Sequence, residues 1–332
     1  MNSQSKNFTE LGKTGPKVFP IGLGCMGFSG IYGDTEDAES VATIRAAIDA
    51  GITLLDTGDF YGMGHNEMLI GRAIAGRRDR VQLSVKFGAL RGPDNSWGGV
   101  DARPAALKNF LAYSLKRLGV EAIDIYRPAR LDPAVPIEDT VGAIADMVKA
   151  GYVKHIGLSE VGVETIARAA KVHPIVDLQI EYSLVTRGPE AKIFPVLEQL
   201  GISATLYGIF SRGLLTGSKG VGGKGDFRAH LPRFSGDSKT NNDRVVASVQ
   251  RFAEARGLTS GQLALSWALA KQPRLVPTVG AKNRAQLADS LAALDKPMSP
   301  ADLRELEALI PADAVQGTRY ATAQMAHLDS EK

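Results

Sequence analysis

The chain has 332 residues, a length that suits one α/β barrel domain spanning 1–332. Its 39 Lys and Arg against 36 Asp and Glu leave a net charge of only +3, and the basic residues are scattered, so we expect no nucleic-acid partner. Hydrophobic residues at 44% and charged residues at 23% exclude a disordered or collagen-like chain. No apolar run approaches the roughly 18 residues of a membrane-spanning helix, so we expect no membrane partner.

Cys25 is the only cysteine in the sequence, so no intramolecular disulfide can form and a secreted disulfide scaffold is excluded. The first twenty residues lack the apolar run of a signal peptide. We therefore expect a cytoplasmic protein. We assign no metal site, and the sequence leaves monomer and homo-oligomer equally open.

Short apolar segments alternate with longer stretches of helical periodicity from Ile21 nearly to the end, which is typical of repeated βα units. Before them, residues 8–11 and 17–20 flank a Gly-Lys-Thr-Gly-Pro turn, which predicts a small hairpin that caps the barrel. The eight strands that we expect are Ile21–Gly24, Thr53–Asp56, Val81–Lys86, Ala122–Arg127, Lys154–Leu158, Ile175–Gln179, Ile202–Leu206 and Leu275–Pro277.

Helix signals lie between these strands. Thr35 can cap the first helix, and Gly51 ends it. Stretches 104–119 and 136–151 likewise begin at proline and end at glycine. Eight parallel strands with crossover helices most simply close into a (β/α)8 TIM barrel, but periodicity alone leaves an open doubly wound sheet as the alternative.

Residues 218–242 interrupt the alternation of strands and helices with a long loop that contains Gly, Lys and Ser. The loop is longer than most connections in a compact domain. It is either a lid over the functional site or a surface insertion without a role.

Polar residues that directly follow barrel strands are the first candidates for chemistry, because active sites of such barrels lie at the carboxyl ends of the strands. Asp56 and Lys86 end neighbouring strands, so we expect a salt bridge between them. Ser159 and Gln179 end two later strands.

Tyr61 follows Asp56 by five residues, on a loop that can turn its hydroxyl back toward Lys86. A phenol beside an ammonium group loses its proton more readily, so we expect the pKa of Tyr61 to shift from about 10 toward neutrality, where the group can transfer protons. The alternative is a structural ion pair with an unrelated surface tyrosine.

Six segments, in order, resemble the aldo-keto reductase family: Ile-Gly-Leu-Gly-Cys-Met-Gly, Leu-Asp-Thr-Gly-Asp-Phe-Tyr-Gly, Ser-Val-Lys-Phe-Gly, Gly-Leu-Ser-Glu, Gln-Ile-Glu-Tyr-Ser-Leu and Ser-Arg-Gly-Leu-Leu-Thr-Gly. The resemblance runs from about residue 11 to 294 and implies a (β/α)8 barrel that uses NAD(P)H on a small carbonyl substrate. It implies that Tyr61 is the proton donor, with Lys86 and Asp56 as its partners. The cofactor contacts that it implies are Gly24, Met26, Asp56, Ser159, Gln179, Tyr182, Ser211, Arg212, Leu214, Gly280, Lys282, Gln286 and Asp289.

Within that set, the resemblance implies that Ser159 and Gln179 contact the nicotinamide carboxamide and that the ring of Tyr182 stacks on the nicotinamide ring. Lys282 favours a 2′-phosphate, because a lysine ammonium gains charge-assisted hydrogen bonds there, so we expect NADPH rather than NADH. Four aromatic residues are candidates to line the substrate mouth, although such side chains are as often ordinary packing: Phe28, Tyr32, Phe60 and Trp97.

Ala129 stands where the family usually has a catalytic histidine, and Glu160 stands where it usually has asparagine. An alanine cannot donate a hydrogen bond, and the loss of one such donor typically costs about 10²–10³ in rate. Strand alternation places Arg127 on the same face as Ala129. We expect Arg127 and Glu160 to form a compensating pair, with Arg127 as a catalytic group; the alternative is that Arg127 points outward and Tyr61 acts alone.

His155 lies near the start of its strand and is expected to be structural, whereas His65 is a weak candidate for the barrel mouth. The sequence thus predicts reversible, NADPH-dependent reduction of an aldehyde or ketone. The alternative function is a slow NADP(H)-binding regulatory or interaction protein, which the change to Ala129 favours and the retained Tyr61 opposes.

Overall fold

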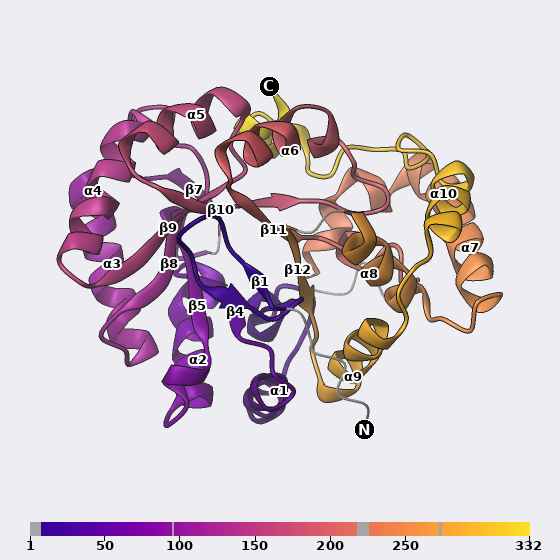
Figure 1. Ribbon diagram of the computed structural model, residues 1–332, viewed down its shortest axis with the longest axis horizontal. Helices are drawn as coiled ribbons and strands as arrows, with labels where there is room; N and C mark the ends of the chain where they lie inside the picture. Colours follow the sequence, from indigo (N-terminus) through magenta and orange to yellow (C-terminus); the bar gives the residue numbers. More distant parts are fainter. Residues whose placement is uncertain (1–7, 95, 218–225, 272–273) are drawn as a thin grey trace.

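The computed structural model describes residues 8–94, 96–217, 226–271 and 274–332. Eight parallel strands close into a barrel in the order β3-β4-β5-β8-β9-β10-β11-β12, as predicted, and the doubly wound alternative is excluded (Figure 1). These strands are β3 Gly22–Gly24, β4 Leu54–Gly58, β5 Gln82–Phe87, β8 Ile123–Pro128, β9 Val153–Ser159, β10 Ile175–Glu181, β11 Ser203–Tyr207 and β12 Leu275–Gly280.

The predicted N-terminal hairpin is present as β1 Thr9–Glu10 and β2 Lys17–Val18, paired antiparallel. Leu11 and Val18 pack with apolar residues from inside the barrel, in a buried cluster completed by Leu54, Ile125, Val176 and Val276. The turn fits because Gly12 has φ +64 and lies against Val176, where a Cβ would come within 2.8 Å of the carbonyl oxygen. The hairpin therefore closes the amino-terminal end of the barrel.

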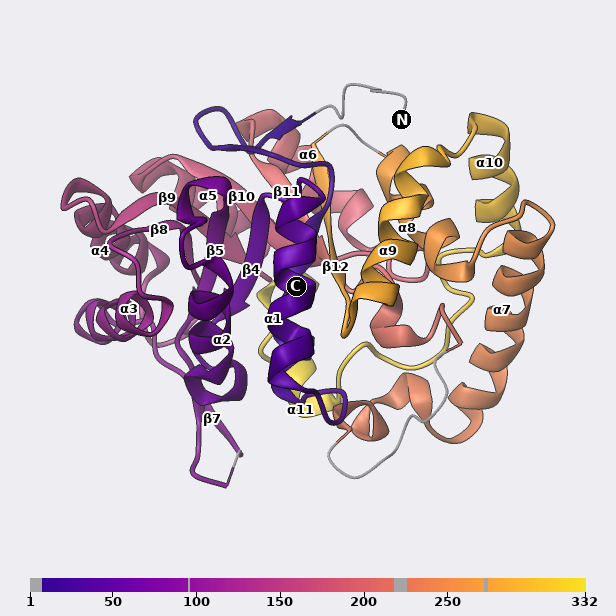
Figure 2. The same cartoon turned by 90° about the horizontal axis from the view of Figure 1, so that it is seen from below.

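Helices surround the barrel, and a second hairpin, β6 Ala89–Arg91 with β7 Trp97–Val100, projects from the opposite end (Figure 2). Apolar residues at helical spacing bury one side of each helix; Leu107, Leu111 and Leu118 do so on α3. The helices are α1 Asp37–Asp49, α2 His65–Ile74, α3 Pro104–Leu118, α4 Ile137–Lys149, α5 Val163–Val172, α6 Pro189–Leu200, α7 Gly236–Glu254, α8 Ser260–Lys271, α9 Arg284–Ala292, α10 Pro300–Leu309 and α11 Thr322–Met325.

The predicted long loop is shorter than its assigned span of 218–242. Residues 218–225 lie outside the described residues, but the remainder contains two 3-10 turns, and α7 begins at Gly236. The early residues of α7, Gly-Asp-Ser-Lys-Thr-Asn-Asn, are mostly weak helix formers, which is why the sequence reads as a loop. Tertiary contacts hold this turn: the buried Asn242 donates to the Arg233 carbonyl and accepts from the backbone of Gln316.

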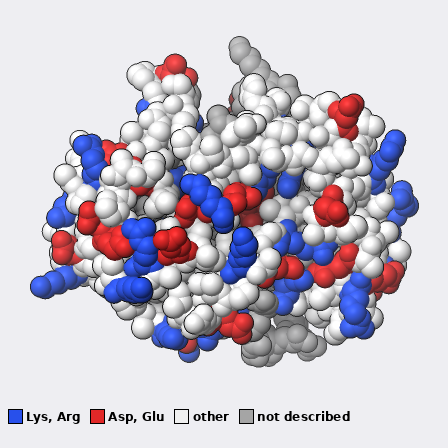
Figure 3. All heavy atoms as spheres, turned by 90° about the horizontal axis from the view of Figure 1, so that it is seen from above, with Lys and Arg blue, Asp and Glu red and all other residues white. Residues whose placement is uncertain are grey.

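No helix in the described part of the chain is long and apolar enough to cross a membrane. Among the same residues, no group of three or more His, Cys, Asp and Glu side chains is placed to hold a metal ion. The face shown in Figure 3 carries basic and acidic side chains interspersed.

Candidate active site

Three buried side chains meet at the carboxyl end of the barrel. Lys86 Nζ lies 2.5 Å from Asp56 Oδ2 and donates to Gln179 Oε1 at 2.9 Å. The amide nitrogen of Gln179 donates in turn to Asp56 Oδ1 at 2.8 Å. The expected salt bridge is therefore present, and a strand from the far side of the barrel completes a closed triangle of polar contacts.

Tyr61 lies directly over this triangle, with Lys86 Nζ 5.2 Å from its ring centroid and the ring of Phe60 edge-on at 4.8 Å. The chain turns back here because Gly62 and Met63 both adopt positive φ. A Cβ on Gly62 would come within 2.9 Å of Ser29, so glycine is required. None of the described residues hydrogen-bonds the Tyr61 hydroxyl, so it can donate to a ligand.

The expected direction of the Tyr61 pKa shift is wrong. Burial raises the pKa of the phenol well above its ordinary value, and the carboxylate of Asp56 raises it further. Lys86 does not reverse this shift, because its charge is offset by Asp56 at 2.5 Å, and burial lowers the pKa of the ammonium itself. Tyr61 thus keeps its proton at neutral pH, as a proton donor must.

Arg127 and Glu160 do not form the predicted pair. Arg127 is 0% exposed inside the barrel, where Nη1 contacts Asp177 Oδ2 at 2.9 Å and Nη2 donates to Ser84 Oγ at 2.9 Å. Ser84 donates to Asp56, so this layer supports the site from below. Gly157 leaves room for the pair, since a Cβ there would come within 2.7 Å of Asp177 Oδ1. Arg127 therefore lies in the layer beneath the reacting groups, which contradicts its assignment as a catalytic group.

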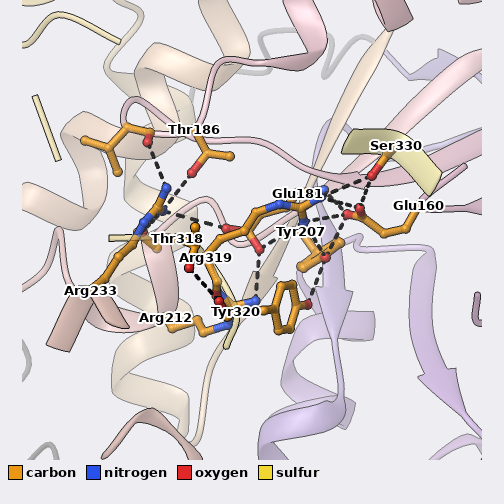
Figure 4. Close-up of polar contacts among 12 residues, drawn as sticks. Glu160, Glu181, Thr186, Tyr207, Arg212, Arg233, Thr318, Arg319, Tyr320 and Ser330 are labelled. Atoms are coloured by element: carbon orange, nitrogen blue, oxygen red, sulfur yellow. Dashed lines mark hydrogen bonds and ion pairs between the residues drawn. The ribbon is translucent and has the colours of Figure 1, made fainter. Parts of the chain in front are cut away.

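Glu160 instead binds Arg319 from the C-terminal tail (Figure 4). Arg319 Nη2 lies 2.5 Å from Glu160 Oε2, and Ser330 and Tyr207 donate to the same carboxylate. Burial alone would raise the pKa of Glu160, but the charge and hydrogen bonds of Arg319 lower it to about 2. Arg319 and Ser330 thus hold the C-terminal tail against Glu160, at the carboxyl end of β9.

Tyr182 does not lie where a nicotinamide ring could stack on it. Its ring is fully buried between Trp267, stacked at 5.0 Å, and Phe194, edge-on at 5.0 Å. Side chains alternate along a strand, and Tyr182 follows Glu181 on the outward side, toward α6 and α8. Tyr207, which ends β11 and is half-buried at the mouth, is the aromatic residue that the sequence analysis missed.

The Ser159 hydroxyl is buried without a hydrogen-bond partner among the described residues, unlike Gln179, whose amide is used within the triangle. Arg212 contacts Glu181 at 2.9 Å and lies over the ring of Tyr320 at 4.3 Å. Ser211 is buried and accepts from Arg233. Leu214 is buried, Gly24 pairs with Asp56 across β3 and β4, and Met26 begins the next 3-10 turn.

A second group of expected cofactor residues lies after β12. Gln286 accepts from the backbone nitrogen of Lys282 at 2.8 Å, and Lys282 Nζ donates to the Tyr32 carbonyl. Gly280 ends β12, and a Cβ there would meet nothing within 4 Å. Asp289 accepts from Gln262 at 2.8 Å.

The aromatic candidates for a substrate mouth separate into two groups. Phe28 is 0% exposed and packs in the hydrophobic core, so its assignment is wrong; the 3-10 turn of residues 26–29 points it inward. Tyr32 and Phe60 are half-buried, and Trp97 on β7 is 38% exposed. These three stay candidates.

Neither histidine under consideration replaces the missing one. Both ring nitrogens of His65 are occupied, by Ser29 Oγ at 3.0 Å and by Asp37 Oδ1 at 2.9 Å. His155 lies near the start of β9, at the end of the barrel away from the triangle. Ala129 itself is buried and continues the pairing of β8, with its nitrogen donating to Phe87 at 2.8 Å.

Comparison with known proteins addresses the family. The model for the Aldo/keto reductase family matches residues 20–311. The chain belongs to the aldo/keto reductase family. Probable aldo-keto reductase 1 of Glycine max is 38% identical over 318 residues, which cover 94% of this chain and 91% of that protein.

Solved structures agree with this assignment. The glycerol dehydrogenase AKR11B4 from Gluconobacter oxydans has a TM-score of 0.83 and 26% identity, covering 96% of this chain and 100% of that one. An aldo/keto reductase from Klebsiella pneumoniae in complex with NADP and acetate has a TM-score of 0.73 and 26% identity, covering 95% and 99%. Family membership makes this chain an oxidoreductase of carbonyl compounds.

Asp59, between Asp56 and Tyr61, makes the stability of this aldo/keto reductase depend on pH. Burial, followed by the charge of Glu67, raises the pKa of Asp59 to about 7. The folded state therefore binds this proton more tightly than the unfolded state, and stability falls as pH rises from about 4 to about 7. At pH 8, Asp59→Asn is expected to raise the free energy of unfolding by roughly 2–4 kcal/mol, because asparagine carries no buried charge.

The measurement is the free energy of unfolding in urea from pH 4.5 to 8.5. Asp59→Asn is expected to be more stable than the parent at pH 8 but not at pH 4.5. The surface variant Asp313→Asn is the control and keeps the parental slope. A parental slope in Asp59→Asn would show that Asp59 titrates normally.

Proposed function

We propose that this aldo/keto reductase reversibly reduces an aldehyde or ketone to an alcohol with NADPH, and that Tyr61 supplies the proton. The observation that carries the proposal is the Tyr61 hydroxyl, which none of the described residues hydrogen-bonds, above the buried pair of Lys86 and Asp56. Proton delivery to a carbonyl oxygen requires a catalytic acid, which Tyr61 provides. It is helped by an ammonium group, Lys86, and by a carboxylate, Asp56, that keeps the ammonium charged.

The residues present fit a nicotinamide dinucleotide. Ser159 offers a buried hydroxyl that has no hydrogen-bond partner in the described part of the chain, and a carboxamide would satisfy it. Tyr207 offers a half-buried ring at the end of β11, and Lys282 offers a cation after β12. The relative from Klebsiella pneumoniae that binds NADP supports the same cofactor here.

Bound there, NADPH supplies the hydride that adds to the carbonyl carbon. The Tyr61 hydroxyl would donate a hydrogen bond to the carbonyl oxygen and transfer its proton to that oxygen as the C=O bond becomes C–O–H. Lys86 stabilises the phenolate that this transfer leaves, and Asp56 keeps Lys86 charged and oriented. Ala129 contributes no hydrogen bond to the carbonyl oxygen, so a low turnover number would be consistent with the proposal.

The test is NADPH oxidation, followed at 340 nm, against a panel of aromatic and aliphatic aldehydes and ketones. Turnover with several members supports the reductase. Tight NADP(H) binding without turnover of any member would instead favour the regulatory or interaction protein.

The same assay tests the coenzyme preference. Lys282→Met is expected to lower kcat/KM for NADPH about 10-fold, because a charge-assisted contact to the 2′-phosphate is lost, and to leave NADH nearly unaffected. Lys149→Met, at an exposed position on α4, is the control. An equal effect of Lys282→Met on both coenzymes would contradict this role.

A further inference from the structure

Arg130 is a cation at the barrel mouth that the mechanism above does not use. It directly follows Ala129, the position of the missing histidine, and is half-buried. Its Nη1 donates to the Ala129 carbonyl at 2.6 Å and its Nη2 to the Tyr320 hydroxyl at 3.3 Å. Two of its five N–H groups are thus accounted for, and both acceptors are neutral.

The neighbouring arginines of the cluster in Figure 4 all contact carboxylates. Arg319 pairs with Glu160 at 2.5 Å, Arg212 pairs with Glu181 at 2.9 Å, and Arg233 lies 3.9 Å from Glu181. Arg130 has no carboxylate within ion-pair distance in the described ranges. The Glu160 carboxylate acts on Arg130 from a longer distance, but Glu160 is already paired with Arg319, so Arg130 lacks a carboxylate of its own.

Arg130 lies at the carboxyl end of the barrel, two residues beyond the end of β8, the strand that pairs with β5 beside Lys86. Its positive charge acts on the Tyr61 phenol, where it lowers the pKa, and also lowers that of Lys86, although burial dominates in both cases. The positive charge of Lys86 is already balanced by the carboxylate of Asp56. The Arg130 guanidinium therefore acts on Tyr61 without an ion-pair partner among the described residues.

We propose that Arg130 forms a subsite for a carboxylate group carried by the carbonyl substrate. This inference rests on the proposed reductase function and adds the substrate class, an aldehyde or ketone acid. A guanidinium presents a planar fork that matches a carboxylate, and one guanidinium without an ion-pair partner among the described residues balances one carboxylate rather than a phosphate dianion. Tyr320, which lies in the C-terminal tail, accepts a hydrogen bond from Nη2 of Arg130 and so helps to orient the guanidinium.

The experiment compares 2-, 3- and 4-carboxybenzaldehyde with their methyl esters, so that the carboxylate is tried at three distances from the carbonyl. The readout is the ratio of kcat/KM for acid over ester in each variant. Arg130→Met is expected to lower this ratio about 10- to 100-fold for at least one isomer. Arg130→Lys is expected to recover part of it, since the charge returns without the fork.

Arg304→Met is the control, because Arg304 is an exposed arginine on α10, away from the site. It is expected to leave the ratio within about threefold. Tyr320→Phe keeps the Arg130 charge and removes one hydrogen bond, so it tests the subsite if Arg130→Met does not fold. It is expected to lower the acid-to-ester ratio below that of the parent protein, and an unchanged ratio in Tyr320→Phe would count against the subsite.

An unchanged acid-to-ester ratio for all isomers in Arg130→Met would overturn the proposal. An equal fall for acid and ester would also overturn it, because Arg130 would then polarise the carbonyl or support the fold. A larger effect on 4-formylphenyl phosphate than on any carboxylate would contradict the assignment to carboxylates.

Failure of the proposed function gives a different result, namely no turnover of the esters by the parent protein. Calorimetric binding of benzoate and benzamide, with and without NADP⁺, then still tests the subsite. Benzoate is expected to bind about 10-fold more weakly to Arg130→Met, with benzamide unaffected. Equal changes for both ligands would refute the carboxylate subsite.

Discussion

Tyr61→Phe is expected to lower kcat for carbonyl reduction about 10²- to 10⁴-fold while NADPH binding stays close to that of the parent. The substitution keeps the ring that lies 5.2 Å from Lys86 Nζ and removes only the hydroxyl. Because burial raises the pKa of Tyr61 well above its ordinary value, the parent phenol remains protonated, and its own titration does not limit reduction below pH 10. Steady-state kinetics and a fluorescence titration with NADPH provide the two readouts.

Tyr113→Phe, at an exposed position on α3, is the matched control and is expected to behave like the parent. Retention of more than a tenth of the parental kcat in Tyr61→Phe would mean that another group delivers the proton. A parallel loss of NADPH affinity would mean that the substitution disturbs the site rather than the proton transfer.

Arg127→Met is expected to lower the free energy of unfolding by about 3–5 kcal/mol, because it leaves the fully buried Asp177 without its partner. The pair spans the barrel interior from β8 to β10, and Thr205 also donates to Asp177 at 2.6 Å. The measurement is denaturant unfolding at pH 7, where two-state behaviour is checked with two probes.

The double variant Arg127→Met, Asp177→Leu is expected to regain part of this stability, since both charges are then gone. Arg103→Met breaks an exposed pair with Asp101 and is the control, with little measurable change expected. A single Arg127→Met variant as stable as that control would show that Asp177 is accommodated without its cation.

The barrel could be predicted from the sequence because each strand is a short apolar run and the helices carry their own end signals. Pro104 at the start of α3 and Gly119 after its end are examples. Periodicity could not choose between a closed barrel and an open sheet, because that depends on the pairing of β12 with β3, strands far apart in the chain. The start of α7 was missed because tertiary contacts override its weak local preference.

The central part of the site followed from position alone, since Asp56 and Lys86 end neighbouring strands. The ion-pair partners of the other buried charged residues could not be predicted in this way. Arg319 and Glu160 are 159 positions apart, and the tail that carries Arg319 has no periodic pattern. Strand alternation placed Arg127 correctly inside the barrel, but only the structure shows that Asp177 is its acceptor and that Arg130 donates to the Ala129 carbonyl.

The most direct measurement of the central proposal is the fate of deuterium from NADPH labelled at the transferable C4 position. With benzaldehyde as substrate, the proposal predicts benzyl alcohol with one deuterium on the carbinol carbon, detected by NMR, and a yield that falls at least 100-fold in Tyr61→Phe. Alcohol formed without deuterium, or at the parental rate in Tyr61→Phe, would contradict direct hydride transfer with Tyr61 as the proton donor.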